Sequence, residues 1–116
     1  MKERRIPLLV LLDTPRYDDN PLDCIARSRD PEACSLTRRQ AEAIVSLSHD
    51  AETRALLRAQ YGRWMDPLPL VCDAQICPLV TDDGIVTYHD THHLTTSFTT
   101  TLSSALSQEL DQTLTS

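Results

Sequence analysis

The sequence feature that most limits the fold is an uninterrupted apolar run over residues 6–12, which stops at Asp13-Thr14-Pro15-Arg16. A run without polar alternation is typical of a parallel strand buried on both faces. It therefore predicts a parallel sheet and an α/β domain. Ligands in open α/β sheets bind where strands end, so Asp13 and Arg16 are candidates for ligand contact, although a solvated strand-end turn is the simpler alternative.

Composition limits the class of protein further. A chain of 116 residues with 41% apolar and 24% charged residues is one small domain at most. The net charge of −6 argues against a nucleic-acid partner, because phosphate binding needs a basic stripe and the Lys and Arg residues are scattered. The basic start over residues 1–5 resembles that of a signal peptide, but no small-residue cleavage site follows the apolar run. We therefore expect no export signal in this chain.

Local sequence signals predict a loop, helices and a short strand between residues 17 and 72. The turn-forming and charged residues 17–35 predict a long loop. The Thr37-x-x-Gln40 capping box predicts a helix start, and a second helical run is expected from a cap at Asp50 to a stop at Gly62. Ser48-His49 is either the joint between the two runs or the middle of one helix. Residues 63–66 follow as a short strand, and the prolines make residues 67–72 irregular.

The last third of the chain predicts a β-hairpin and a C-terminal helix. Asp83-Gly84 lies between two apolar runs, which is a strong hairpin signal. Large apolar residues then recur at every fourth position and predict one amphipathic helix with these side chains in the core. They are Leu94, Phe98, Leu102, Leu106, Leu110 and Leu114.

The four cysteines form two local pairs, Cys24 with Cys34 and Cys72 with Cys77. Disulfides close loops of these lengths readily, and of the possible connectivities the local one is the simplest. A zinc site is the rival, although neither spacing is that of a zinc knuckle, and free buried thiols are the third alternative. Disulfides would place the protein outside the reducing cytosol.

Asp90 and His93 stand three residues apart where the hairpin gives way to the last helix. A tight turn there can bring the carboxylate to one imidazole nitrogen and leave the other free, as in a serine acyl-transfer site. By spacing alone, a helix cap and a surface histidine are the simpler interpretation. The crowding of His89, Asp90, His92 and His93 could also suit a transition metal. Consecutive histidines rarely converge on one ion, so we expect no metal and no other cofactor.

A family resemblance covers nearly the whole chain. The segment Tyr88 to Thr95, followed by an apolar-periodic helix, resembles the end of SGNH domains fused to acyltransferase-3 membrane proteins. The Pro-led strand that ends in Asp13-Thr14-Pro15, the two cysteine pairs and the strand-end Asp66 occur in the same order. By this resemblance, Asp90 and His93 are the acid and base of a Ser-His-Asp triad, and His92 is an intervening residue.

The resemblance implies the C-terminal half of a flavodoxin-like three-layer SGNH fold, with residues 1–116 as a single partial domain. The family's Gly-Asp-Ser nucleophile block does not occur, and the only glycines and asparagine are Gly62, Gly84 and Asn20. Ser97, Ser103, Ser104 and Ser107 fall within the predicted last helix, not at a strand-to-helix turn that would expose a nucleophile. Without a nucleophile and an oxyanion hole, we expect the chain alone to be inactive.

The function that the resemblance implies is acyl transfer, usually of acetyl groups, to hydroxyls of cell-envelope polysaccharide, with ester hydrolysis as its counterpart. The expected partners are the missing N-terminal half or the membrane acyltransferase domain, together with the carbohydrate acceptor. The expected location is extracytoplasmic, in a membrane-anchored parent protein. A non-catalytic remnant or a carbohydrate-binding module with the same fold is the alternative. Half a sheet also leaves an open edge, which predicts marginal stability.

Overall fold

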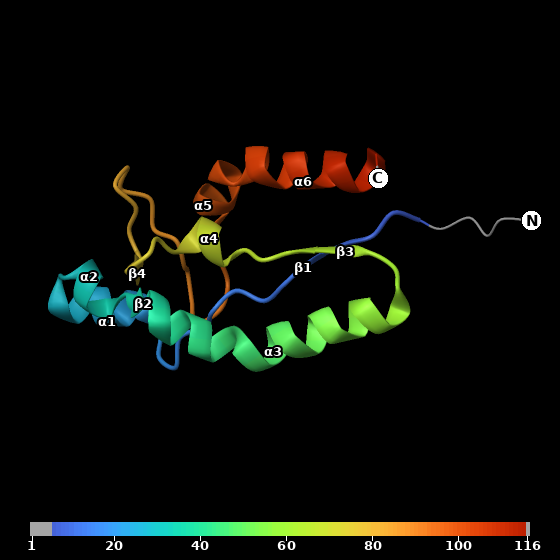
Figure 1. Ribbon diagram of the computed structural model, residues 1–116. Helices are drawn as coiled ribbons and strands as arrows, with labels where there is room; N and C mark the ends of the chain where they lie inside the picture. The colour runs from blue at the N-terminus through green and yellow to red at the C-terminus, as the bar shows by residue number, and fades with distance from the viewer. Residues whose placement is uncertain (1–5, 116) are drawn as a thin grey trace, which may run out of the picture.

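The computed structural model describes residues 6–115, so the basic start over residues 1–5 lies outside the described part. Strands β1 (Leu9–Leu11) and β3 (Arg63–Met65) pair in parallel, with Val10 opposite Trp64. Helix α3 (Arg38–Ala59) lies on one side of these strands and helix α6 (Ser103–Thr115) on the other (Figure 1). The predicted α/β fold with a short parallel sheet is confirmed. No helix within residues 6–115 has the length and apolar character needed to cross a bilayer.

Strand β1 is shorter and more exposed than the apolar run predicts. Only residues 9–11 of the run 6–12 are strand, and Ile6 and Leu11 are 82% and 49% exposed. Among the described residues β1 pairs with β3 alone, so one long side of each strand has no neighbouring strand. The expected open edge is therefore present, and burial on both faces is not reached in this chain.

Two short helices replace the predicted long loop over residues 17–35. Helix α1 (Pro21–Ser28) begins where the Asn20 side chain accepts a hydrogen bond from the Leu22 N–H over 3.0 Å. Helix α2 (Pro31–Cys34) is capped in the same way by Asp30. The loop prediction was wrong because Asn-Pro and Asp-Pro also occur as a cap followed by the first helical residue, where proline loses no hydrogen bond.

Helix α3 is one continuous helix, so of the two alternatives Ser48-His49 lies in mid-helix and is not a joint. The Thr37 and Gln40 capping box opens it as predicted. Asp50, expected to cap a second helix, lies in mid-helix and pairs with Arg54 over 3.0 Å. The helix ends at Gln60, which adopts a left-handed conformation with φ of 53°, just before the expected stop at Gly62.

A compact cluster around one disulfide forms the core at one end of the molecule. The segment 67–72, predicted to be irregular, contains helix α4 (Leu68–Val71), because the Asp66 carboxylate accepts from the Leu68 N–H over 2.8 Å. Strands β2 (Leu36–Thr37) and β4 (Ile76–Cys77) pair in antiparallel register beside it. The buried residues of this cluster are Ala41, Leu68, Val71, Cys72, Cys77 and Phe98.

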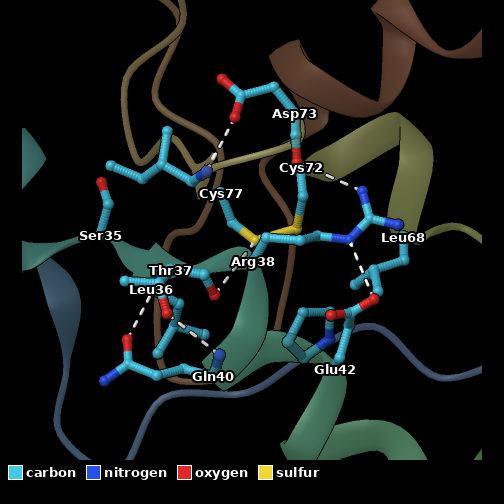
Figure 2. Close-up of a disulfide and its surroundings, with 12 residues drawn as sticks. Ser35, Leu36, Thr37, Arg38, Gln40, Glu42, Leu68, Cys72, Asp73 and Cys77 are labelled. Carbon is cyan, nitrogen blue, oxygen red and sulfur yellow. Dashed lines mark hydrogen bonds and ion pairs between the residues drawn. A yellow bond between two sulfur atoms is a disulfide. The ribbon is translucent and has the colours of Figure 1, made fainter.

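Both predicted cysteine pairs are disulfides. Cys24–Cys34 joins α1 to α2, and Cys72–Cys77 joins the end of α4 to β4. Figure 2 shows the second bond between the start of α3, at Thr37 and Arg38, and Leu68 of α4. The Arg38 guanidinium donates to the Asp73 carbonyl over 3.2 Å, so the loop that this disulfide closes is tied to α3. The zinc and free-thiol alternatives are thereby excluded for these four residues.

The predicted hairpin is present but short. The Thr81 N–H donates to the Ile85 carbonyl over 2.9 Å, and Val80 and Val86 form a single antiparallel bridge. Gly84 has a φ of 82°, a conformation that glycine adopts at little cost. The Asp-Gly signal therefore located the turn correctly.

The C-terminal segment forms two helices in place of one. Helix α5 (Thr96–Thr101) ends at Leu102, and α6 follows. Phe98 is buried as predicted, but Leu110 and Leu114 are 50% and 66% exposed. The break at Leu102 interrupts the four-residue periodicity, and α6 instead presents polar side chains to β3.

Arg63 determines which face of α6 meets the sheet. Its guanidinium contacts Glu109 over 3.2 Å and the hydroxyl of Thr113 over 3.3 Å, and Thr113 is only 8% exposed. A half-buried arginine needs such partners, whereas leucine side chains can lie at an incomplete surface. The prediction that all the leucines face the core was wrong for this reason.

The two disulfides differ in what they contribute to stability. From loop-closure entropy, Cys24–Cys34 stabilises the fold by about 2.7 kcal/mol, because it closes a loop with a sequence separation of 10. Cys72–Cys77, with a separation of 5, contributes less, about 2.1 kcal/mol. Cys72 and Cys77 are also 6% and 4% exposed, and each buried sulfur removed costs about 1 kcal/mol in packing. We expect the C72A/C77A double variant to lose more free energy of unfolding than C24A/C34A, by about 1 kcal/mol.

Urea titration of the two double variants, at one protein concentration, checks this order. The C24A/C34A variant is the matched control, because it removes a disulfide of half-buried cysteines from outside the core. An equal or larger loss in C24A/C34A would show that the buried disulfide does not organise the core.

Candidate active site

The tight turn over residues 88–94 carries Asp90 and His93. Tyr88 and Leu94 form an isolated antiparallel bridge, and the His89 N–H donates to the His93 carbonyl over 3.0 Å. Inside this turn, Asp90 Oδ1 accepts from the N–H groups of His92 and His93 over 2.9 and 2.7 Å. Aspartate favours such turns because its short side chain reaches its own backbone two or three residues on. The carboxylate is thus fixed by the backbone that it organises.

The second oxygen of Asp90 faces the imidazole of His93. Asp90 Oδ2 lies 2.7 Å from His93 Nδ1, and the two side chains are 33% and 60% exposed. An ionised carboxylate can only accept, so the neutral ring carries its proton on Nδ1. The lone pair is then on Nε2, which is free to take a proton from a hydroxyl. The pair has the geometry that the predicted acid and base require, and its catalytic role stays a prediction.

Hydrogen bonds keep the Asp90 carboxylate charged. The backbone N–H of His92, followed by the side chain and the backbone N–H of His93, holds the pKa of Asp90 well below its usual range. Each of these donors stabilises the charged form, and the group is too exposed for desolvation to oppose them strongly. The orienting carboxylate therefore stays ionised at neutral pH.

Two hydrogen bonds attach this turn to the loop that follows β1. The Tyr88 hydroxyl donates to the Pro15 carbonyl, and the Tyr17 N–H donates to the Thr91 carbonyl over 2.8 Å. The rings of Tyr17 and Tyr88 meet edge to face, with centroids 5.1 Å apart. Burial raises the pKa of Tyr88, against the opposing effect of its hydrogen bond with Thr14, so this phenol stays a neutral donor.

The end of β1 and the turn share a cleft of about 470 Å³. Asp13 and Arg16, candidates for ligand contact for which a solvated turn was the simpler interpretation, both line it, together with His92. One wall of the cleft is apolar and comes from α3, through Ile44, Val45 and Leu47. The cleft brings the strand end beside the turn, and His92, which was interpreted only as an intervening residue, lies on its wall.

The serines considered as nucleophiles lie in the C-terminal helices. The serines at 97, 103, 104 and 107 fall in α5 and α6, as predicted, and the structure places none of them at a strand-to-helix turn. His49, which sequence reasoning did not single out as a site residue, lies in α3 with its Nε2 2.7 Å from the Asp13 carbonyl. Nothing in the sequence around His49 signals this contact, because it joins positions 36 residues apart.

The short parallel sheet with helices on either side agrees with an SGNH-type α/β fold. The family comparison agrees: the model described as "SGNH domain (fused to AT3 domains)" matches residues 1–108, and the chain belongs to this family. The predicted resemblance is confirmed. No curated protein and no solved structure matches the chain.

Replacement of Asp90 by asparagine tests the effect of the carboxylate charge separately from the effect of the hydrogen bonds within the turn. The amide introduced by D90N keeps an oxygen for the two backbone N–H groups but loses the charge beside His93. Because the folded-state pKa of Asp90 is lowered, its contribution to stability is present above about pH 4 and is lost as the pH falls further. We expect D90N to be less stable than the wild type at neutral pH and this difference to shrink steadily below about pH 4.

Urea midpoints measured over an acid-to-neutral pH series check the expectation. The control is D90A, which removes the turn acceptor as well and should be less stable than D90N throughout. A wild-type advantage over D90N that is the same at every pH would show that the charge of Asp90 does not stabilise the turn.

Proposed function

We propose that this chain is the acid–base part of an SGNH O-acyltransferase or esterase domain, with Asp90 as the acid and His93 as the base. The observation that carries the proposal is the 2.7 Å contact between Asp90 Oδ2 and His93 Nδ1, in the turn whose His92 lines the cleft that follows β1. Membership of the SGNH family supports it independently of this geometry.

The chemistry follows from the free Nε2 of His93. A serine hydroxyl gives its proton to Nε2 as its oxygen attacks the acyl carbonyl, and Asp90 stabilises the imidazolium that forms. His93 then returns the proton to the leaving group, which leaves an acyl-enzyme. The incoming acceptor hydroxyl passes its proton to Nε2 as its oxygen attacks the acyl carbon. The bond from that carbon to the serine oxygen then breaks, and His93 returns the proton to this oxygen, which restores the serine hydroxyl. Water in the acceptor's place gives the esterase reaction.

The serine and the oxyanion donors must come from other residues, because no Gly-Asp-Ser occurs in the sequence. We propose that they lie in an N-terminal block of the parent domain, adjacent to β1. The apolar surface at this edge supports the idea, since Leu8 and Leu11 are 39% and 49% exposed. Exposed apolar surface beside an unpaired strand is typical of an interface.

The proposed acceptor is a hydroxyl of a cell-envelope polysaccharide, and the proposed location is extracytoplasmic. The family's fusion to AT3 domains supports a membrane acyltransferase as the partner domain. The cleft offers a carboxylate, a hydroxyl and a guanidinium, from Asp13, Thr14 and Arg16, groups that suit sugar hydroxyls. The two disulfides support an oxidising compartment.

An acyl-ester assay tests the proposed roles. With p-nitrophenyl acetate, we expect this chain alone to give no burst of p-nitrophenol. Joined to the upstream segment that supplies Gly-Asp-Ser, it should give a burst equal to the number of active sites. H93A should lower the turnover by about 10⁶-fold and D90N by about 10⁴-fold, the losses typical of triad residues.

A surface variant, R54A, is the matched control, because Arg54 is exposed on α3 and pairs only with Asp50 among the described residues. A burst from this chain alone that depends on His93 would contradict the proposal. Full activity of H93A in the joined protein would also contradict it, and no activity of the joined wild type would favour a non-catalytic remnant.

A further inference from the structure

His89 is the residue at this turn that the proposed acyl-transfer chemistry does not use. His89, Asp90 and His93 each offer one metal-ligand atom, and these atoms all lie within 4.8 Å of one another. Asp90 Oδ2 is 2.7 Å from His93 Nδ1 and 3.7 Å from His89 Nδ1. Among the described residues these three form the one such group found.

The turn holds the three donors in place before any ligand arrives. The hydrogen bond between the His89 N–H and the His93 carbonyl sets the two residues opposite each other. Their rings stack with centroids 5.5 Å apart and planes 12° apart. Asp90 Oδ1 is occupied by two backbone N–H groups, which directs Oδ2 toward both rings. The backbone of the turn therefore brings the donors together, and the two rings turn out of their parallel arrangement when their in-plane lone pairs meet at one ion.

The spacing fits a tetrahedral transition-metal ion. Zinc binds imidazole nitrogen and carboxylate oxygen at about 2.0–2.2 Å, which puts neighbouring donors about 3.3 Å apart. The separations of 2.7 and 3.7 Å from Asp90 Oδ2 lie on either side of that value, and the two histidine donors lie within 4.8 Å of each other, so side-chain rotations of the exposed histidines are needed to close the set around an ion. The sequence argument against a metal concerned consecutive histidines, whereas the structure pairs His93 with His89 across the turn.

We propose that His89 Nδ1, Asp90 Oδ2 and His93 Nδ1 form a binding site for a divalent transition metal such as Zn²⁺, with water completing the coordination. Coordination at His93 Nδ1 moves the ring proton to Nε2. That nitrogen is then a donor and no longer takes a proton from a hydroxyl. The bound ion and the base role of His93 are therefore mutually exclusive, and the site acts as a reversible metal switch. Only this inhibitory step rests on the proposed function.

His92 serves as the matched control. It is adjacent to His93 and similarly exposed, but its Nδ1 lies 3.0 Å from the Thr91 hydroxyl and faces Asp90 Oδ1, the oxygen already occupied by backbone donors. It is outside the three-residue group. Loss of His92 should therefore leave metal binding intact.

Isothermal titration of the chain with ZnCl₂ at neutral pH tests binding without any reference to activity. We expect one ion per chain, unchanged affinity in H92Q and weaker affinity in H89Q. The loss should be at least the roughly 10–100-fold that a missing outer-shell partner costs. Nitrogen-15 spectra should show the Nδ1 signals of His89 and His93 shifting with zinc. No saturable binding, or equal losses in H89Q and H92Q, would overturn the site.

Activity of the joined protein carrying Gly-Asp-Ser tests the switch. Zinc should inhibit the wild type and H92Q, each relative to its own metal-free rate, and chelation should restore that rate. H89Q should need more zinc by the same factor as its loss of affinity. Zinc that binds but does not inhibit would overturn the switch and the base role of His93. An active enzyme that binds no zinc would overturn the metal site alone.

Discussion

The attachment of the 88–94 turn to the loop after β1 is the interaction on which the candidate site depends. The buried Tyr88 donates to the Pro15 carbonyl, and the Thr91 carbonyl accepts from the Tyr17 N–H. These bonds join segments more than 70 residues apart in the chain. Because of them, the turn that carries Asp90 and His93 lies beside the loop after β1, and His92 of this turn lines the cleft at the strand end.

The structure was predictable where a local sequence signal is compatible with only one conformation. The Thr37 capping box, the Asp83-Gly84 turn and the two cysteine pairs all form as the sequence indicates. Asn20-Pro21 was ambiguous, because the same dipeptide suits a loop and a helix start. The face of α6 was not predictable, since it depends on Arg63 from a strand about 50 residues earlier.

The site shows the same division between local and distant causes. The resemblance indicated Asp90 and His93, and their three-residue spacing permits the contact that the structure has. The pairing of His89 with His93 needs the backbone bridge across the turn, and Tyr88 is placed by its partner Pro15. Contacts of this kind depend on how the chain closes on itself, which residue spacing does not encode.

The central claim is that His93, oriented by Asp90, accepts a proton from a serine of the parent domain. An experimental structure of this chain joined to its Gly-Asp-Ser block tests it most directly, through the distance from the serine Oγ to His93 Nε2. The account predicts a hydrogen-bond distance of about 2.6–3.2 Å, with Nδ1 still bonded to Asp90. A serine that lies out of reach of Nε2, with His93 turned to solvent or to another partner, would contradict it.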